Sequence, residues 1–561
     1  MAKAYLIGLD FGTESARGVR IDVVTGRQED SVVHPYDHGV ITAALPGGRA
    51  LPPAFALQDP DDYLAAAAAI LTMLGAGRRI VSIGIDFTAS SPLPTTRDGT
   101  PLSRLLPDQP HAYVKLWKHA AAQPYAEAIN RRGGDFLQNF GGRLSGEWLL
   151  AKAAQLRDEA PDIWKLAERF IEAGDWLVSQ LAGREARSLN FAAYKAQYLP
   201  ATGYPRDAVP GLADRLAAPL EVGSPAGELT DDWLKRTGIA GPTVIAVAAI
   251  DSHAVVPAVN AVHNRTLVSA LGTSAAYLYL TDRFQPLPRG LEGAAENAAL
   301  PGFWGYEAGQ PAFGDVLAWF ARAFPRDADD GRNFELYNAA AAAIRPGTHP
   351  VLAIDWWSGN RVPFADTNLS GLLVGLNLTT TAPAIYRALI EGLCFGARTI
   401  IEVLAAGGLP TERLIVTGGV AERSPLIVQT LADVTGLDAE VPLIDNATSV
   451  GAAIHRAVAA GVVAGFAEGQ ARFGAERMQR YRPDAELAPI YDEIYAHYRA
   501  LTEDDEVRKT MRSLSALASR TYANSQAGRN EVEHNATGHN ETGRNETGRA
   551  DEIAAGASGQ R

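Results

Sequence analysis

The alternation of apolar and polar positions along the chain predicts buried strands that are followed by amphipathic helices. Short aliphatic runs bounded by glycine or polar residues are typical of buried strands, and they occur at residues 5–9, 80–87, 243–248, 265–271 and 413–417. Longer segments with helical spacing separate several of these runs. This arrangement predicts an α/β fold.

Several of the longer segments carry residues typical of helix ends. Asp59 suits an N-cap and Pro60 suits the first turn of a helix that we expect to end at Gly75. Further helices are expected at 386–405, 425–435, 447–460 and 507–519, and helical segments are expected to dominate 111–181. The helix at 447–460 has small residues on one face, so it should pack closely. Residues 27–53 and 183–225 are expected to be irregular.

One strand-to-loop unit occurs twice. The first strand leads into Asp10-Phe11-Gly12-Thr13, and the run at 265–271 leads into Gly272-Thr273-Ser274. The run Ile83–Phe87 repeats the pattern of residues 7–11 and places a second acid, Asp86, at a strand end. The repetition predicts two similar α/β halves that face each other across a cleft, each directing one loop at the same ligand.

The first of these loops combines donors for an anion with an acid for a cation. Thr13 and Ser15 offer hydroxyl and backbone N–H donors, whereas the Asp10 carboxylate only accepts. Gly12 either takes a positive φ or lets a ligand approach the backbone closely. This is the combination that a magnesium-nucleotide site requires, although a strand ending in Asp-x-Gly-Thr can also be a simple turn.

Composition limits the possible functions. With 561 residues the chain is too long for one hydrophobic core, so two or three domains are expected. A net charge of −13 disfavours binding to nucleic acid or an anionic membrane. The histidines show no spacing typical of a zinc site. The apolar segment 243–262 is interrupted by Asp251, His253 and Pro257, which argues against a membrane span.

The termini and the single cysteine bear on localisation. Cys394 is the only cysteine, so no intramolecular disulfide is possible and a reducing compartment is expected. The N-terminus has no signal-peptide pattern, and we therefore expect a cytoplasmic protein. From residue 524 the chain is polar, with a five-residue repeat at 535–549, and is expected to be disordered. The repeat matches the N-glycosylation pattern, which we attribute to coincidence.

The two Gly-Thr loops, Gly418-Gly419 and an acid between the halves together resemble the FGGY family of carbohydrate kinases, over about residues 5–499. Further motifs support the resemblance, at 86–91, 116–119, 194–195, 307–315 and 355–361. It implies duplicated actin/hexokinase-like (ribonuclease H-like) domains flanking a catalytic cleft. The expected division is an N-terminal domain at 1–258, a nucleotide-binding C-terminal domain at 259–505, and a helix with a polar tail at 506–561.

The resemblance also implies roles for single residues at the phosphate end of the cleft. Asp251 corresponds to the base that accepts the proton of the sugar hydroxyl, although it could also simply cap the helix that begins at Ser252. Asp10 would hold Mg²⁺. The resemblance implies contacts with ATP for the remaining residues, which are Gly12, Thr13, Gly272, Thr273, Gly418, Gly419 and Arg423.

The sugar-contacting residues form a separate group. Lys195 and Glu307 correspond to a pair that reads sugar oxygens and hydroxyls, and Ala89 would line the floor of the pocket. Ala89 replaces the Gly or Ser of some relatives. Trp117 and Lys118 would stack on the sugar and orient it. A solvated lysine and a core tryptophan are the ordinary alternatives.

The function implied is ATP- and Mg²⁺-dependent phosphorylation of the terminal hydroxyl of a ketopentose, with L-ribulose favoured by the motifs, as in arabinose catabolism. Alternatives are a kinase of this family acting on D-ribulose, xylulose, erythritol or glycerol, a non-catalytic sugar- or nucleotide-binding regulator, and an actin-like ATPase. The expected partners are the sugar and ATP, without nucleic acid or membrane, and a homodimer is an open alternative to a monomer.

Overall fold

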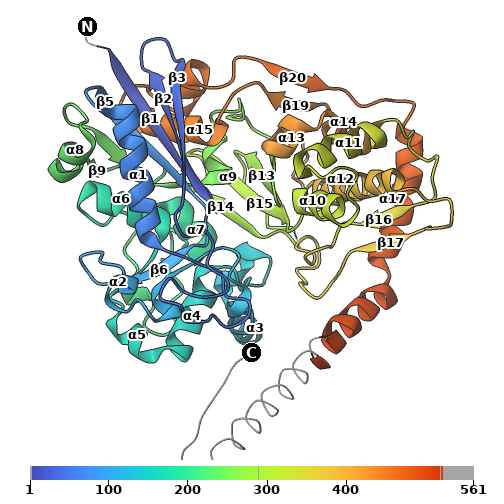
Figure 1. Ribbon diagram of the computed structural model, residues 1–561, viewed down its shortest axis with the longest axis horizontal. Helices are drawn as coiled ribbons and strands as arrows, with labels where there is room; N and C mark the ends of the chain where they lie inside the picture. The colour runs from blue at the N-terminus through green and yellow to red at the C-terminus, as the bar shows by residue number, and fades with distance from the viewer. Residues whose placement is uncertain (1–2, 289, 519, 522–561) are drawn as a thin grey trace, which may run out of the picture. The chain divides into compact units, whose positions relative to one another are not determined.

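The computed structural model describes residues 3–288, 290–518, 520 and 521 of the chain. Residues up to Ala500 form one compact unit, and a second unit begins at Leu501. The first unit is a mixed α/β structure built on two seven-stranded sheets (Figure 1). The α/β class and the duplicated actin-like architecture are thereby confirmed.

The first sheet has the strand order β3-β2-β1-β5-β10-β9, with β11 pairing beside β5. These strands are β1 (Ala4–Phe11), β2 (Ser15–Asp22), β3 (Gln28–Pro35), β5 (Arg79–Phe87), β9 (Pro225–Glu228), β10 (Val244–Ala246) and β11 (Ala249–Ile250). The prediction for residues 27–53 missed β3. This strand is largely exposed and polar, so it carries no buried run to reveal it.

The second sheet repeats this topology in the order β14-β15-β13-β12-β18-β19-β20. Its strands are β12 (Thr266–Leu271), β13 (Ala275–Thr281), β14 (Gly293–Glu296), β15 (Trp304–Gln310), β18 (Arg413–Thr417), β19 (Ala439–Pro442) and β20 (Met478–Tyr481). In each sheet the first strand pairs antiparallel with the second and parallel with a later one, β5 or β18. In each half, the loop of the first hairpin therefore lies at the same edge of the sheet as the carboxyl end of the parallel strand, β5 or β18.

The helices of the first half surround and extend its sheet. They are α1 (Pro60–Gly75), α2 (Leu102–Leu105), α3 (Gln123–Arg132), α4 (Leu149–Glu159), α5 (Pro161–Leu166), α6 (Ala173–Ala182), α7 (Leu189–Ala196), α8 (Asp231–Thr237) and α9 (Asp251–Ala254), with short 3₁₀ turns η1 (Pro110–Ala112), η2 (Ala120–Ala122), η3 (Asp135–Phe140) and η4 (Ala213–Arg215). As predicted, Asp59 caps α1, accepting from the backbone N–H of Asp61 at 3.0 Å.

The helices of the second half are α10 (Gly314–Ala323), α11 (Asp330–Ala342), α12 (Ala382–Ala406), α13 (Gly419–Arg423), α14 (Pro425–Thr435), α15 (Ala447–Ala459), α16 (Phe466–Phe473) and α17 (Ala488–Glu503). Minor strand pairs are β4 (Leu57–Gln58) with β7 (Val114–Lys115), β6 (Pro92–Thr95) with β8 (Arg169–Glu172), and β16 (Leu352–Ile354) with β17 (Leu372–Val374). The helices expected at 386–405, 425–435 and 447–460 are confirmed. No helix in the described part of the chain is long and apolar enough to cross a membrane.

Glycines let two helices approach the first sheet from opposite faces. A Cβ on Gly18 of β2 would lie 2.3 Å from the Ile70 side chain of α1, and a Cβ on Gly8 of β1 would lie 1.7 Å from the Ser449 carbonyl oxygen of α15. The close packing predicted for the small-faced helix is thus confirmed, but α15 lies against the first sheet although it follows the strands of the second. A Cβ on Gly451 would similarly contact the Ala254 carbonyl oxygen of α9.

Two local predictions were wrong. Tyr194 and Lys195, expected in an irregular segment, lie in α7, whose N-cap Ser188 accepts from the backbone N–H of Asn190. Trp117 and Lys118, expected in a helical segment, follow the short strand β7 in a turn. In the second unit, residues 505–518 are helical, as the pattern at 507–519 predicts, with Ser519 and the polar repeat outside the described residues.

Candidate functional site

A cleft of about 420 Å³ is lined by side chains from both halves of the first unit. Eleven of the predicted site residues line it, which are Asp10, Gly12, Thr13, Ala89, Trp117, Lys195, Asp251, Gly272, Thr273, Glu307 and Gly418. A cavity of about 730 Å³ shares Gly272 and Thr273 with the cleft and adds Gly419 and Arg423. Both volumes suit small-molecule sites. Lys118 is exposed and does not line either of them.

In both Gly-Thr loops the glycine N–H is used within the loop, although the acceptor lies three residues ahead in the first loop and two residues ahead in the second. Gly12 donates its backbone N–H to the Ser15 carbonyl oxygen at 3.0 Å, and Gly272 donates to the Ser274 carbonyl oxygen at 2.9 Å. Neither glycine has a positive φ. Both glycine N–H groups are therefore already used within the loops and are not available to donate to phosphate in this structure. Since Gly12 has no positive φ, the other role predicted for it remains, which is that a ligand approaches the backbone closely because glycine has no side chain.

Two carboxylates meet where β1 and β5 end. Asp10 and Asp86 are register neighbours on these parallel strands. The Thr448 hydroxyl donates to Oδ2 of Asp10 at 2.7 Å, whereas both oxygens of the buried Asp86 lack a hydrogen-bond partner among the described residues. Burial, and then the negative charge of Asp10, raise the pKa of Asp86. A cation would offset the repulsion between the two carboxylates and the unpaired state of Asp86, so the residues fit Mg²⁺.

Asp10 and Asp86 are too few to form a complete set of protein ligands for a metal ion. No group of three or more His, Cys, Asp or Glu side chains that could hold a metal ion occurs among the residues described. Mg²⁺ typically keeps several waters and binds through one or two carboxylates together with substrate phosphates. Asp10, with Asp86 behind it, is therefore suited to hold Mg²⁺ that arrives with a nucleotide.

Asp251 begins α9 at the centre of the cleft. Its Oδ1 accepts the Ser252 backbone N–H at 2.6 Å, but Asp251 is itself the first residue of α9, and Ile250 holds the N-cap position without a side-chain capping bond. The ordinary alternative of a capping aspartate is therefore wrong. Burial, and then the nearby charge of Asp10, raise its pKa to about 7. The sequence had suggested no such shift. A carboxylate with a pKa near neutrality is matched to proton transfer at physiological pH.

Asn190 of α7 fixes the turn that carries Asp251. Its Oδ1 accepts the Ile250 backbone N–H at 2.6 Å, and its Nδ2 lies 2.8 Å from Nδ1 of His253. Burial lowers the pKa of His253 to about 4, so the imidazole is neutral and can accept this bond. Sequence reasoning missed Asn190, because its partners lie far along the chain.

Lys195 and Glu307 form a buried ion pair between the two halves. Nζ of Lys195 in α7 lies 2.8 Å from Oε1 and 2.9 Å from Oε2 of Glu307 in β15. Burial opposes ionisation of Glu307, but the charge of Lys195 outweighs it and lowers the pKa of this carboxyl. Tyr194 adds a second link from α7, donating to the Gly305 carbonyl oxygen at 2.9 Å. The predicted sugar-contacting pair is thus brought together and charged.

Trp117 lines the cleft and contacts the first Gly-Thr loop. Its Nε1 donates to Oγ1 of Thr13 at 3.2 Å, so it is more than a core tryptophan. The ammonium of Lys118 lies 5.1 Å from the centroid of the Trp117 ring, outside the cleft. The structure therefore brings Trp117 into the site, but it does not bring Lys118 there.

Lys152 supports the floor of the cleft from below. Its Nζ donates to the Ser90 carbonyl oxygen at 2.6 Å and to the Leu116 carbonyl oxygen at 2.8 Å. Ser90 follows Ala89 and has a φ of 60°, which is rare for a residue with a side chain. This fully buried ammonium thus ties the segment that carries Ala89 to the turn that carries Trp117. No pattern in the sequence indicated this role.

The cleft is also lined by a tight turn at Gly418, which has a φ of 96°. A Cβ at this position would lie 2.5 Å from the Leu271 carbonyl oxygen, so the turn requires glycine. Arg423 folds back over the turn that follows, where its Nε donates to the Gly419 carbonyl oxygen at 2.8 Å. The ordinary tight turn and the cavity lining predicted for these residues occur together.

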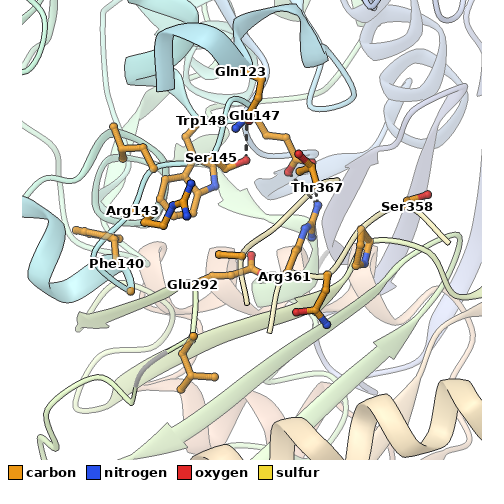
Figure 2. Close-up of a pocket in the computed structure, with 17 residues that line it drawn as sticks. Gln123, Phe140, Arg143, Ser145, Glu147, Trp148, Glu292, Ser358, Arg361 and Thr367 are labelled. Carbon is orange, nitrogen blue, oxygen red and sulfur yellow. Dashed lines mark hydrogen bonds and ion pairs between the residues drawn. The ribbon is translucent and has the colours of Figure 1, made fainter. Parts of the chain in front are cut away.

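Three further charged side chains line the cleft, and no role was predicted for them. Glu147, Glu292 and Arg361 also line an adjoining cavity (Figure 2). Nη2 of Arg361 lies 3.0 Å from Oε1 and 2.9 Å from Oε2 of Glu147, an ion pair between the two halves. Arg361 ends one of the motifs listed above, but only the fold places Glu147 and Glu292 beside it.

The chain is similar to known proteins over most of its length. Residues 267–460 match the model of the FGGY family of carbohydrate kinases, C-terminal domain. The chain is 37% identical over 549 residues to a ribulokinase of Bacillus licheniformis, covering 92% of this chain and 99% of the relative. It is 38% identical over 527 residues to a ribulokinase of Mycolicibacterium smegmatis, covering 89% and 93%.

Solved structures agree on the fold. The xylulose kinase from Rhodospirillum rubrum superposes with a TM-score of 0.74 at 20% identity, covering 89% of this chain and 98% of that one. Such a likeness at low identity concerns the architecture, and it carries no information about the acceptor.

Proposed function

The chain belongs to the FGGY family of carbohydrate kinases, and from this premise we propose that it transfers the γ-phosphoryl group of ATP to the terminal hydroxyl of L-ribulose, giving L-ribulose 5-phosphate and ADP. The similarity to ribulokinases over nearly the whole chain supports the ketopentose. One observation carries the chemistry: the half-buried Asp251 lies in a single cleft with both Gly-Thr loops and the Lys195–Glu307 pair.

Asp251 is the proposed base. The sugar hydroxyl oxygen forms a bond to the γ-phosphorus, the bond from that phosphorus to the β,γ-bridging oxygen breaks, and ADP leaves with the electron pair. The hydroxyl proton passes to the Asp251 carboxylate. Asn190 keeps this carboxylate in position through the backbone of Ile250, which supports a fixed geometry for the transfer.

The two Gly-Thr loops are the proposed contacts of the triphosphate, with Gly12 and Gly272 allowing close approach and Thr13 and Thr273 supplying donors. The cavity beyond Gly272, lined by Gly419 and Arg423, is the proposed place of the adenosine. Asp10, with Asp86, is proposed to hold Mg²⁺. When bound, Mg²⁺ would neutralise charge on the β- and γ-phosphates.

The acceptor is proposed to lie between Trp117 and the Lys195–Glu307 pair, over Ala89. The lysine ammonium donates to sugar oxygens and the glutamate accepts from hydroxyls. Because Lys195 and Glu307 come from different halves, an acceptor that binds both would hold the halves together around the phosphoryl group. That arrangement limits the access of water.

We also place the reaction in the cytoplasm, where ATP is available and the buried thiol of Cys394 stays reduced. The homodimer remains a prediction, as do the domain limits at 258 and 505.

A coupled assay of ADP release tests the proposal. With ATP and Mg²⁺, L-ribulose should give saturable turnover within the range of about 1–100 s⁻¹ found for kinases. D-Ribulose, xylulose, erythritol and glycerol serve as the comparison panel, and an incubation without sugar is the blank. Higher kcat/KM for another acceptor would replace L-ribulose by that acceptor. ADP release that does not depend on sugar would favour the actin-like ATPase.

A further inference from the structure

One carboxylate oxygen of the half-buried Glu292 has no hydrogen-bond partner among the described residues. Glu292 immediately precedes β14 and donates its backbone N–H to the Glu307 carbonyl oxygen at 3.0 Å, so its place beside the proposed sugar site is fixed. Its side chain lines both the cleft and the adjoining cavity. Oε1 of Glu292 is inaccessible to solvent and has no hydrogen-bond partner in the described part of the chain. Burying an unpaired carboxylate oxygen is costly unless a ligand satisfies it.

A guanidinium faces the same point in the cleft. A Cβ built on Gly309 would lie 2.8 Å from Nη1 of Arg361 and 2.9 Å from Oε1 of Glu292, so the two groups converge there. Among the described residues Arg361 nevertheless forms its ion pair with Glu147 and not with Glu292. Figure 2 shows this ion pair, with Glu292 on the other side of Arg361. The gap is therefore bounded by a group that only donates and a group that only accepts.

The gap lies away from the phosphate end of the cleft. The charged neighbours that influence Asp251 are Asp10, Lys195 and Glu307, whereas those that influence Glu292 are Arg361, Glu307, Lys195 and Glu147. The Lys195–Glu307 pair thus lies near enough to influence both the proposed base and Glu292. An acceptor whose reacting hydroxyl lies at Asp251 and whose middle contacts Lys195 and Glu307 would extend its other end towards Glu292.

We propose that Glu292 and Arg361 bind the hydroxyl at the end of the acceptor opposite the phosphorylated one, with the hydroxyl donating to Glu292 and accepting from Arg361. This rests on the proposed function, for which the group is the C1 hydroxyl of L-ribulose. A hydroxyl fits this gap because it is at once a donor and an acceptor. A cation would be repelled by Arg361, and an anion by Glu292. Glu292 and Arg361 thereby select an acceptor with a terminal hydroxyl at both ends.

A substrate–variant cycle tests this contact. Wild type and Glu292→Gln are assayed with L-ribulose and with 1-deoxy-L-ribulose, which lacks only the C1 hydroxyl. For wild type, removal of the hydroxyl should lower kcat/KM by about 10- to 100-fold, as expected for a hydrogen bond to a charged group. The Gln variant should lose a similar factor with L-ribulose but discriminate between the two sugars less than about threefold. The KM for ATP should stay unchanged.

Controls separate this contact from a general effect on the fold. Glu296→Gln changes an exposed glutamate at the end of β14, the strand that Glu292 immediately precedes, and should behave as wild type with both sugars. Melting temperatures are compared for all variants, and Glu292→Asp takes the place of Glu292→Gln in the cycle if the latter does not fold. The proposal is overturned if the variant keeps the full wild-type preference for L-ribulose over its 1-deoxy analogue, or if wild type shows no preference.

The cycle also distinguishes this inference from the function on which it rests. If wild type does not phosphorylate L-ribulose, the proposed function is wrong. The cycle is then repeated with the best acceptor of the panel and its analogue lacking the hydroxyl farthest from the phosphorylated carbon, where the same loss and the same reduced discrimination would support the role of Glu292. Undiminished discrimination in that cycle would overturn it.

Discussion

The two halves of the protein build the same hairpin with different chemistry at its end. β1 carries Asp10 opposite Asp86 on the parallel strand β5, whereas β12 carries Ala270 opposite Thr417 on β18. In both hairpin loops the glycine N–H donates to a carbonyl oxygen of the same loop, that of Ser15 in the first half and that of Ser274 in the second. The duplicated backbone is therefore retained, while the acids occur in one half only.

The same contrast holds at the next strand of each sheet. Asp251 follows β11 and begins α9, and Asp445 follows β19 shortly before α15. Asp251 is half-buried and lines the cleft, whereas Asp445 is exposed. In the proposed function, the first half thus contributes the carboxylates for a proton and a cation, and the second half contributes neutral backbone for the phosphates and the nucleotide. If both halves were acidic at this point, they would repel the triphosphate.

The largest effect on turnover should come from replacing Asp251, while its counterpart in the other half, Asp445, should tolerate the same change. Asp251→Asn keeps the size of the side chain but cannot accept a proton, so kcat should fall about 10²- to 10⁴-fold, the usual contribution of a general base. ATP affinity should change little. Asp445→Asn is the matched control from the other half and should leave kcat unchanged. Steady-state kinetics and nucleotide titration check both variants, and equal losses in the two would remove the functional difference between the halves.

The next largest effect concerns the Asp10/Ala270 pair. Asp10→Asn removes the charge but can still accept the Thr448 hydroxyl, so the Mg²⁺ concentration for half-maximal activity should rise about 10- to 100-fold. Binding of ATP without Mg²⁺ should not weaken, because the negative charge near the phosphates has decreased. Activity measured over a range of Mg²⁺ concentrations tests the first statement, and calorimetry without metal tests the second. Asp108→Asn, an exposed acid of the first half, is the control.

A smaller effect should follow from pH. Because burial and Asp10 raise the pKa of Asp251 to about 7, the carboxylate that accepts a proton is lost below this pH, and kcat should fall about tenfold per pH unit there. Rates from pH 5.5 to 8.5 at saturating substrates measure this dependence. The residual activity of Asp251→Asn should lack it, since any contribution from protonation of ATP persists in the variant. An identical profile in the variant would assign the dependence to ATP.

The sequence predicted those parts of the fold and site that local patterns determine. Buried runs, caps and glycine stops placed β1, β5, β12, β18, α12, α14 and α15 correctly. The repeated Gly-Thr units implied two halves before any contact was known. By contrast, β3 was missed because both of its faces are polar, and α7 because the segment around Lys195 carries too few turns to show a helical period.

Supporting residues escaped prediction for a different reason. Asn190, Lys152 and Glu292 each act through partners that are distant in sequence, so no spacing reveals them. The Gly12 and Gly272 backbones show the converse. Both glycines line the cleft, but their N–H groups are already used in bonds within the loops. Residue types follow from local chemistry, whereas the atoms left available to a ligand depend on tertiary contacts.

The smallest expected effect tests why both hairpins keep a glycine that the backbone does not require. A Cβ on Gly272 would lie 3.6 Å from the Ser274 carbonyl oxygen, an ordinary contact, so Gly272→Ala should fold with a melting temperature close to that of wild type. If the triphosphate lies against this loop, the added methyl group should raise the KM for ATP severalfold and leave the KM for sugar unchanged. Gly418→Ala is the contrasting variant, since its Cβ would meet the Leu271 carbonyl oxygen at 2.5 Å and should lower the melting temperature. A Gly272→Ala variant with normal KM for ATP would show that the second hairpin does not contact the phosphates, and the division of roles between the halves would then rest on the first hairpin alone.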